Sequence, residues 1–137
     1  YGVPQRRRRL VLLASRVSSV AFAKPSKKSR TVRDAIGRMP TAGTSGDPLH
    51  DLPEKRSCCV AARIRLVPID GGSRASLPKH LTLDCHKTSD GFKDVYGRMA
   101  WDELAPTITT GCFNPSKGRF LHPEADRAIT MREAALL

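Results

Sequence analysis

The sequence predicts an α/β fragment, in which one buried strand precedes an irregular region of mixed α+β structure. Residues 10–13 form a fully apolar run that is too short for a helix and typical of a strand covered on both faces. Two capping patterns, which begin at Thr31 and Thr130, predict only short helices. Turn-forming residues separate the remaining ordered stretches, and the length of 137 residues suffices for one domain.

The strand is preceded by a polar run that is dominated by arginine. Side chains alternate along a strand, so Gln5, Arg7 and Arg9 share one face, whereas Arg6 and Arg8 share the other. Guanidinium groups this close together repel one another unless an anionic or polar group lies opposite them. Because each one offers a planar fork of donors, we expect a phosphate or a base edge as that partner. A solvated basic flank is the alternative interpretation.

A connector and a short helix follow the strand. Residues 16–30 are rich in Ser and Lys and predict an exposed connector, with a short strand or turn within 17–23. The helix begins after Thr31, because Thr31 and Asp34 have the spacing of a capping box, and a glycine ends it. Residues 40–48 are turn formers throughout and predict a surface loop.

The middle of the chain predicts one more helix and a sharp turn. Residues 50–64 favour a helix, in which Pro53 is tolerated only near the start. Two adjacent glycines at 70–74 predict a turn whose backbone can approach another group closely. A phosphate cradle is one interpretation of this turn, although the usual role of paired glycines favours a plain turn.

The last third predicts a strand and a terminal helix. Residues 94–101 form an ordered segment that carries the single tryptophan, and 105–111 alternate threonine with isoleucine as a strand does. Pro106 stands at the first position of that strand, where proline is tolerated. A polar turn at 114–119 follows, and a capping box opens an apolar helix at 130–137.

The composition points to a polyanionic partner. Lys and Arg number 24 against 13 acidic residues, which gives a formal charge of +11 and a pI near 10.2. Such an excess attracts polyanions, and nucleic acid is the usual one. Aromatic residues make up only 5% of the chain, which argues against the stacking platforms of single-strand binders. No apolar run approaches the ~18 residues of a membrane span, and no secretory signal is present, so we expect no membrane partner.

The cysteines do not predict a metal site. They stand at positions 58, 59, 85 and 112, and no pair has the Cys-x-x-Cys spacing of a zinc site. A chain of this length and charge does not need a disulfide framework. We therefore expect free thiols in a reducing compartment and no bound metal.

Several motifs together resemble one enzyme family. The pattern Pro-Gln-x-Arg-x-Arg at 4–9, followed by the apolar run, resembles the eighth sequence motif of the DNA (cytosine-5) methyltransferases. Two further segments are similar to bacterial members, at 31–37 and 70–74, and residues 94–98 begin the C-terminal part of the resemblance. Residues 105–134 resemble the end of the target recognition region and the ninth motif. The order and spacing of these segments make the resemblance specific.

The resemblance implies a division of the chain into three parts. Residues 1–15 would end the catalytic domain and supply one strand of its Rossmann-like sheet. Residues 16–124 would form the target recognition region, and 125–137 the ninth-motif helix that returns to the catalytic domain. Ligands of open α/β sheets lie beyond the carboxyl ends of parallel strands, whereas these arginines lie at an amino end. We therefore expect the strand at 9–15 to run antiparallel to its neighbours.

The resemblance also assigns roles to single residues. Arg9 would contact the flipped cytosine, with Arg7 and Gln5 orienting it or touching the DNA backbone. A guanidinium at the O2 edge would stabilise the charge that nucleophilic attack pushes into the pyrimidine ring. Further DNA contacts are expected from five residues: Arg98, Thr107, Thr109, Lys117 and Arg119. Thr107 matches a threonine of the family that meets a phosphate. From side-chain chemistry alone, Arg98 would read a guanine edge or contact only a phosphate, and Lys117 and Arg119 would contact phosphates or lie in a solvated loop. Three more residues would fasten the recognition region to the catalytic half: Arg127, Arg132 and Glu133.

The family's reaction machinery is not encoded here. None of the four cysteines follows a proline, as the family's nucleophile does, and the Glu-Asn-Val, Phe-x-Gly-x-Gly and Gly-Asn-Ser motifs are absent. The parent would be a bacterial or phage cytoplasmic enzyme of restriction-modification that transfers a methyl group from S-adenosylmethionine to double-stranded DNA. This chain alone would bind no S-adenosylmethionine and would need the remainder of its own catalytic domain as a partner.

Other interpretations stay open from the sequence. The chain begins with Tyr1 and ends inside a predicted helix, which favours a piece of a longer polypeptide. One alternative is a non-catalytic basic module that binds DNA or RNA. Another is a remnant that does not fold, because its apolar strand has lost its partners. For His122 we expect a structural role, since no acid or nucleophile is placed to use it.

Overall fold

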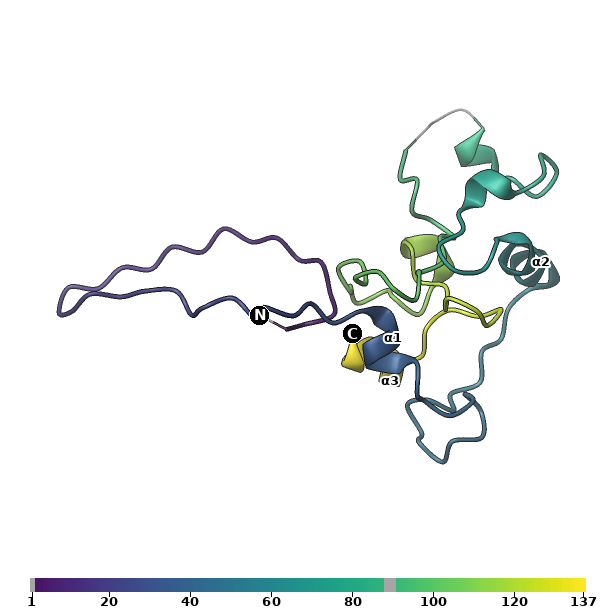
Figure 1. The fold of residues 1–137 in the computed structure, drawn as a ribbon. Helices are drawn as coiled ribbons and strands as arrows, with labels where there is room; N and C mark the ends of the chain where they lie inside the picture. The colour runs from purple at the N-terminus through teal and green to yellow at the C-terminus, as the bar shows by residue number, and fades with distance from the viewer. Residues whose placement is uncertain (1, 88–90) are drawn as a thin grey trace.

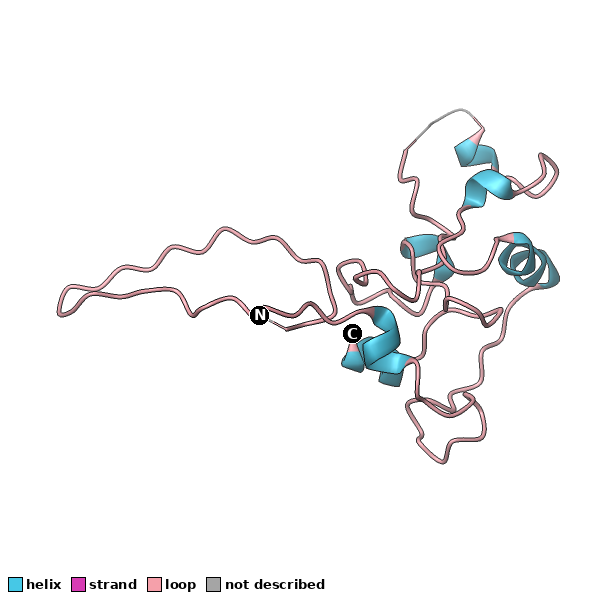
Figure 2. Ribbon diagram, in the orientation of Figure 1, coloured by secondary structure: helices cyan, strands magenta, loops and turns pink. Residues whose placement is uncertain are grey.

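The computed structural model describes residues 2–87 and 91–137, so Tyr1, the first residue of the predicted 1–15 segment, lies outside the described residues. An extended arm, residues 2–30, projects from a body formed by residues 31–137 (Figure 1). Long irregular segments join the few helices of the body (Figure 2). The α-helices are α1 (Val32–Ile36), α2 (Cys58–Leu66) and α3 (Met131–Leu136). Single 3-10 turns occur at Arg74–Ser76, Asp84–His86 and Pro115–Lys117.

The arm corrects the prediction of a buried strand at 10–13. The run is extended but forms no ladder with another described segment, and Leu10 is 100% and Leu12 88% exposed. A strand covered on both faces needs partners that satisfy its backbone groups and bury its side chains. The described residues offer no such partner, so burial is not achieved within this chain. The Rossmann-like sheet and the antiparallel orientation of 9–15 stay predictions about a larger polypeptide.

Both predicted capping boxes are confirmed. The Thr31 hydroxyl accepts from the Asp34 amide, and the Asp34 carboxylate accepts from the Thr31 amide, so α1 begins at Val32. At the other end of the chain, Thr130 and Glu133 make the same reciprocal pair and open α3. Each box satisfies two amides that a helix N-terminus otherwise leaves without partners.

Two other predicted elements have different bounds. The helix expected at 50–64 begins only after Ser57, so Pro53 lies in the irregular segment before α2. The strand expected at 105–111 is reduced to an isolated parallel bridge between Gln5 and Ala105, and the chain turns at 109–114. Alternation alone did not produce a strand there, because only residues 4–6 of the arm lie alongside it to pair.

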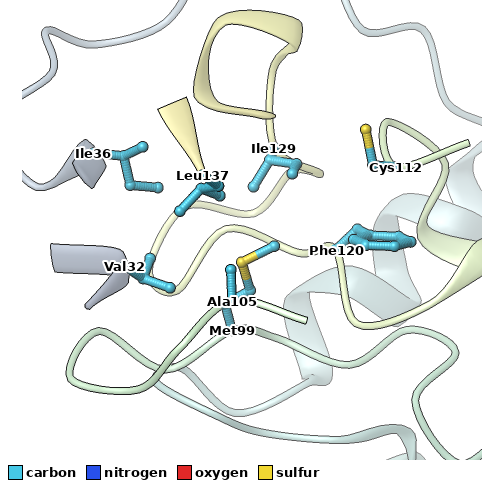
Figure 3. Packing of buried hydrophobic residues seen from close by; sticks show 8 residues of the cluster. All are labelled: Val32, Ile36, Met99, Ala105, Cys112, Phe120, Ile129 and Leu137. Carbon is cyan, nitrogen blue, oxygen red and sulfur yellow. The ribbon is translucent and has the colours of Figure 1, made fainter. Parts of the chain in front are cut away.

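Two small hydrophobic clusters hold the body together. The larger one brings α1, α3 and the segments between 99 and 129 into contact (Figure 3), through Val32, Ile36, Met99, Ala105, Cys112, Phe120, Ile129 and Leu137. The smaller cluster joins α2 to the segments around 96 and 121, through Ile64, Val67, Tyr96 and Leu121. Within the described ranges, no helix is long and apolar enough to cross a membrane.

Short backbone bridges connect the segments around residues 98, 121 and 128. Leu121 forms a parallel bridge with Arg98 and an antiparallel bridge with Ala128. The diglycine turn lies beside this group, because the Arg98 amide donates to the carbonyl of Gly72 at 2.9 Å. A Cβ on Gly72 would lie 2.0 Å from the Pro68 carbonyl oxygen. The close approach that the glycines permit is thus to the chain's own backbone, as expected for a plain turn.

Candidate nucleic-acid interface

The base of the arm is fixed to the segment that carries Thr107. The Arg6 amide donates to the Ala105 carbonyl at 2.8 Å, and the Ala105 amide donates to the Pro4 carbonyl at 2.9 Å. The Thr107 hydroxyl donates to the Arg6 carbonyl at 2.8 Å. Residues about a hundred positions apart are therefore held side by side. The predicted base-contacting segment and the predicted phosphate-contacting threonine lie in one place.

The arginines of the arm are open to solvent. Arg7 and Arg9 are exposed, and the Arg9 guanidinium donates to the neighbouring Arg8 carbonyl at 2.8 Å. Gln5 is half-buried, with its amide nitrogen 3.5 Å from the Leu137 carbonyl oxygen. Residues 1–30 carry 9 of the 24 basic residues and none of the 13 acidic ones. The arm thus concentrates positive charge on an accessible surface, which suits a polyanion.

The prediction that Arg98 reads a guanine edge is wrong for this structure. Arg98 is 0% exposed. Its Nε donates to the Val67 carbonyl at 3.1 Å, and its Nη2 donates to the Ile64 carbonyl at 2.9 Å and to the Asp126 carboxylate at 2.6 Å. Its Nη1 donates to three carbonyls of the 122–125 turn. The guanidinium therefore has no donor left for a base, and it joins the C-terminal end of α2 to that turn.

The remaining residues predicted to contact DNA differ in the solvent exposure of their side chains. Thr109 and Lys117 are exposed on the turn-rich segment 109–118. Arg119 is half-buried, because its Nη1 donates to the carbonyls of Gly71, Gly72 and Arg98, and its Nε donates to Asp94 at 3.0 Å. A side chain held in this way positions the diglycine turn. Lys117 and Thr109 keep the accessibility that a phosphate contact requires.

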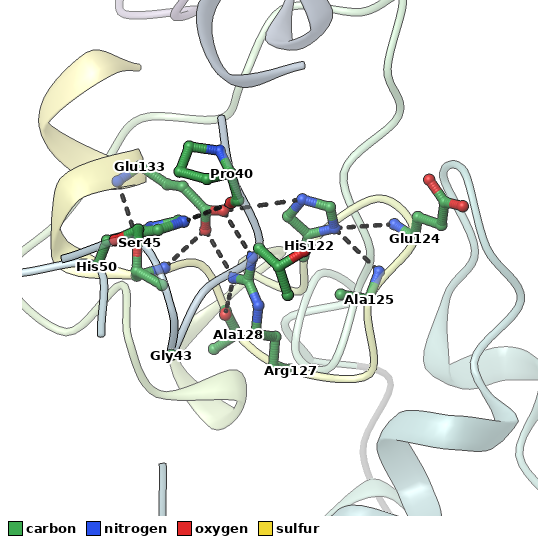
Figure 4. Close-up of polar contacts among 12 residues, drawn as sticks. Pro40, Gly43, Ser45, His50, His122, Glu124, Ala125, Arg127, Ala128 and Glu133 are labelled. Carbon is green, nitrogen blue, oxygen red and sulfur yellow. Dashed lines mark hydrogen bonds and ion pairs between the residues drawn. The ribbon is translucent and has the colours of Figure 1, made fainter. Parts of the chain in front are cut away.

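The three ninth-motif residues make ion pairs inside the body. Arg127 donates from both Nη atoms to Glu133 at 2.7 Å, a bidentate pair next to the N-terminus of α3 (Figure 4). Arg132 pairs with Asp47 at 2.5 Å and so ties α3 to the loop before His50. Glu133 is buried, and although burial acts to raise the pKa of its carboxyl, the Arg127 hydrogen bonds hold that pKa below its usual range. These contacts fix α3 within this chain.

Two histidines, neither assigned a chemical role from the sequence, complete this polar network. His122 Nδ1 accepts from the amides of Glu124 and Ala125 at 3.1 and 2.9 Å, which fixes the neutral ring with its proton on Nε2 (Figure 4). Burial and the nearby Arg127 lower the pKa of His122 to about 4. His50 is 1% exposed and bridges the Thr130 hydroxyl and the Pro40 carbonyl. The structural role expected for His122 agrees with these contacts.

The loop at 43–51 folds around one carboxylate. Asp51 accepts from the amides of Gly43, Ser45 and Gly46 at 2.7–3.1 Å and from the Ser45 hydroxyl at 2.8 Å. Partial desolvation acts to raise the pKa of Asp51, but these donors outweigh it and lower that pKa to about 2. No pattern in the sequence predicted this carboxylate site, because its donors are mostly backbone amides.

Among the described residues, the cysteines and acidic side chains form no metal-binding cluster. All four cysteines are free thiols, and Cys112 alone among them is buried. Burial raises the pKa of the Cys112 thiol, which makes it less nucleophilic. Among the residues that the structure describes, no group of three or more His, Cys, Asp or Glu side chains could hold a metal ion.

Comparison with known proteins identifies the relatives of the chain. Over its whole length the chain is 43% identical to the Type II methylase M.HgiDII of Herpetosiphon aurantiacus, of which it covers 41%. It is 35% identical over 98% of its length to the Type II methyltransferase M1.BsuMI of Bacillus subtilis, of which it covers 32%. DNA (cytosine-5)-methyltransferase 1A of Oryza sativa is 32% identical over 63% of the chain, which covers 5% of it. No family model and no solved structure matches the chain.

The two bacterial relatives are named a Type II methylase and a Type II methyltransferase, so the class of protein is that of the methyltransferases. The plant relative then specifies the family. The chain is thus a homologue of Type II and plant DNA (cytosine-5) methyltransferases, and it spans about two fifths or less of the relatives it matches. The resemblance seen in the sequence motifs is thereby confirmed.

Proposed function

We propose that the chain is the DNA-recognition part of a DNA cytosine-5 methyltransferase, and that its arm supplies the arginine that contacts the flipped cytosine. The parent protein would transfer a methyl group to cytosine carbon five in duplex DNA. Acting on bacterial or phage DNA, it would work in the cytoplasm. The family of the chain supports the reaction, and the structure supports the division of labour between its residues.

One observation carries the assignment of the arm. The pairing of residues 4–6 with 105–107 holds the start of the arginine run against Thr107. Base flipping costs a few kcal/mol, which contacts to the neighbouring backbone must offset. A base contact from Arg9 and a phosphate contact close to Thr107 would meet this need from one place. Arg7 would orient Arg9 or touch the backbone beside it.

The residues of this chain do not fit S-adenosylmethionine, the methyl donor that the family implies. The diglycine turn at 70–72 is filled by its own backbone, since a Cβ on Gly72 would lie 2.0 Å from Pro68. The pocket beside it is lined by arginines, which repel a sulfonium cation. Beside the larger pocket, Asp51 is fully engaged by the 43–46 backbone and Glu54 pairs with Arg56. We therefore expect the donor site on polypeptide outside this chain.

A graft tests the proposed function. The chain would replace the matching 41% of the Herpetosiphon methylase, and methyl transfer to duplex DNA would be measured together with duplex affinity. We expect an active chimera in which Arg9→Ala lowers methyl transfer by about a hundredfold, or 2.7 kcal/mol. Duplex affinity should change by less than about threefold, because one exposed contact among many is lost.

The control for the graft is Arg16→Ala, an exposed arginine of the same arm outside the eighth-motif pattern. It should leave methyl transfer close to that of the unmodified chimera. A folded chimera that binds DNA and transfers no methyl group would overturn the proposed function. Equal losses of transfer and affinity in Arg9→Ala would remove only the assignment of Arg9 to the base.

A basic module without chemistry is the second candidate. The charge of +11 and the solvent-exposed arm favour it, because they suffice for binding any polyanion. Such a module would bind all duplex sequences about equally. Sequence preference therefore separates the two candidates.

A further inference from the structure

A basic pocket lies on the body next to α2 and beside the diglycine turn. It has a volume of about 430 Å³ and is lined by Arg63 of α2, by Ser73 and Arg74 after the diglycine turn, and by His86. In Figure 1 this part of the body, at α2 and the segment after it, lies at the end opposite the arm. The ninth-motif network and the base of the arm do not share these four residues.

Arg74 is the unusual member of the pocket. Its Nη2 donates to the Gly91 carbonyl at 2.6 Å, but its Nη1 is buried and has no hydrogen-bond partner among the residues that the structure describes. An unsatisfied buried donor is costly, and more so when it is charged. Native structures rarely leave one without a function, an ion or water to satisfy it. The missing partner must be an acceptor, and a negative charge would compensate the guanidinium best.

Two further lining residues, Arg63 and Ser73, have donors that make no hydrogen bond among the described residues. Arg63 donates its Nε to the Leu81 carbonyl at 2.7 Å, and neither of its terminal nitrogens makes a hydrogen bond within residues 2–87 and 91–137. The Ser73 hydroxyl accepts from the Ala75 amide and keeps its own proton to donate. Among residues 2–87 and 91–137, no Asp, Glu, Asn or Gln lines the pocket. A base edge presents donors as well as acceptors, whereas a phosphate presents acceptors only, so this lining suits a phosphate.

The local field agrees with this interpretation. Burial is the main cause that lowers the pKa of His86, and the charges of Arg74 and Arg63 lower it further. Leu77 and Leu83 form apolar parts of the wall, which strengthens electrostatic attraction inside the pocket. Arg119 contributes less, because Asp94 pairs with it at 3.0 Å.

We propose that this pocket binds one phosphate group, and that its source is a backbone phosphodiester of duplex DNA. The inference rests on the proposed function for the source of the phosphate, though not for the chemistry of the pocket. Because the pocket and the arm lie at opposite ends of the body, a duplex that reaches both lies along the body (Figure 1). The pocket then fixes the position of the duplex without reading its sequence, as phosphate contacts do.

The first experiment uses labelled duplex DNA and the 137-residue chain. Affinity is measured by fluorescence anisotropy over a series of salt concentrations for the unmodified chain, Arg74→Gln and Arg65→Gln. Arg65 is the matched control, because it is an exposed arginine of α2 that does not line the pocket. Arg74→Gln should weaken binding about tenfold at low salt and reduce the slope of log affinity against log salt by about 0.9. Arg65→Gln should change affinity by less than about twofold.

The second experiment uses inorganic phosphate and follows the His86 ring by NMR. Phosphate should shift the His86 resonances and raise the pKa of His86, because a bound anion offsets the two arginines. The response should persist in Arg65→Gln and vanish in Arg74→Gln. If circular dichroism shows that Arg74→Gln does not fold, Arg63→Gln replaces it in both experiments. The same losses of duplex affinity and of the phosphate response are then expected.

The outcomes separate the site from the proposed function. If the chain binds no duplex but His86 still responds to phosphate, the proposed function fails and the pocket stands as a phosphate site. If His86 responds but Arg74→Gln binds duplex as Arg65→Gln does, the pocket takes free phosphate and the DNA source is overturned. If phosphate leaves His86 unchanged, the pocket proposal is overturned altogether.

Discussion

Replacing Arg98 by methionine should destabilise the body severely. Methionine keeps an unbranched aliphatic stem but lacks the guanidinium carbon and its two terminal nitrogens, so the change removes the charge, its donors and the volume of the guanidinium head. The guanidinium donates to the carbonyls of Ile64, Val67, His122 and Ala125 at 2.5–3.1 Å, with a further 3.5 Å contact to Glu124. The carbonyls of Ile64 and Ala125 would keep the amides of Val67 and Arg127 as donors, whereas those of Val67, His122 and Glu124 would lose the donor that the guanidinium supplies, at a site where Arg98 is 0% exposed.

The size of the effect follows from these contacts. A buried acceptor that loses its partner costs about 1–3 kcal/mol, and removing one member of a buried charged network costs about 3–5 kcal/mol in all. The ion pair with Asp126 adds little, because that side chain is 50% exposed and water screens it. At ~0.05–0.15 kcal/mol per residue, a chain of 137 residues has a stability of about 7–20 kcal/mol. The loss is therefore a large share of the total.

Urea denaturation followed by Trp101 fluorescence measures this loss. Trp101 packs edge-on against His122 with ring centroids 5.2 Å apart, close to the turn that Arg98 holds. Arg65→Met, on the exposed surface of α2, is the control and should cost less than about 0.5 kcal/mol. An Arg98→Met chain as stable as the control, with relaxed sequence preference on DNA, would refute the buried role and restore Arg98 as a base contact.

Three further predictions test other parts of the body. The free energy of unfolding should fall by up to about 3 kcal/mol as the pH drops from 6.5 to about 4, because burial lowers the pKa of His122 and only the unfolded chain takes up the proton readily. Urea titrations at several pH values measure this loss. His122→Gln should flatten the dependence of stability on pH. Gly72→Ala should cost at least about 2 kcal/mol in a thermal melt, because its Cβ would meet the Pro68 carbonyl oxygen at 2.0 Å; an unchanged melt would contradict the turn geometry. Thr107→Val removes the 2.8 Å bond to the Arg6 carbonyl and should speed hydrogen exchange of the Arg6 amide by about fivefold, since a neutral bond contributes about 1 kcal/mol; unchanged exchange would mean that the hydroxyl does not fix the arm.

Local signals predicted the elements that depend on local contacts. The capping boxes at Thr31 and Thr130 are read from side chains three residues apart, and both form as predicted. The diglycine turn was also predictable, since its geometry depends on the absence of side chains. The apolar run at 10–13 was not, because its burial depends on strands that other polypeptide must supply.

The role expected for Arg98 rested on the commonest base contact of arginine, and that general preference does not tell a buried arginine from an exposed one. Arg98 stands between Gly97 and Met99, and all three positions are buried. A lone arginine in a largely apolar segment is a signal for a buried hub that holds backbone carbonyls. His50 gave no such signal, since its partners Pro40 and Thr130 come together only through the fold.

The sequence preference of duplex binding tests the central claim most directly. The 137-residue chain would be incubated with a library of randomised duplexes, and the bound fraction sequenced at increasing salt. If the chain is the recognition part of a cytosine-5 methyltransferase, one short cytosine-containing sequence should be enriched, and its advantage should persist as salt weakens the contacts to phosphates. Equal recovery of all sequences, lost uniformly as salt rises, would contradict the account and leave a basic module that binds any polyanion.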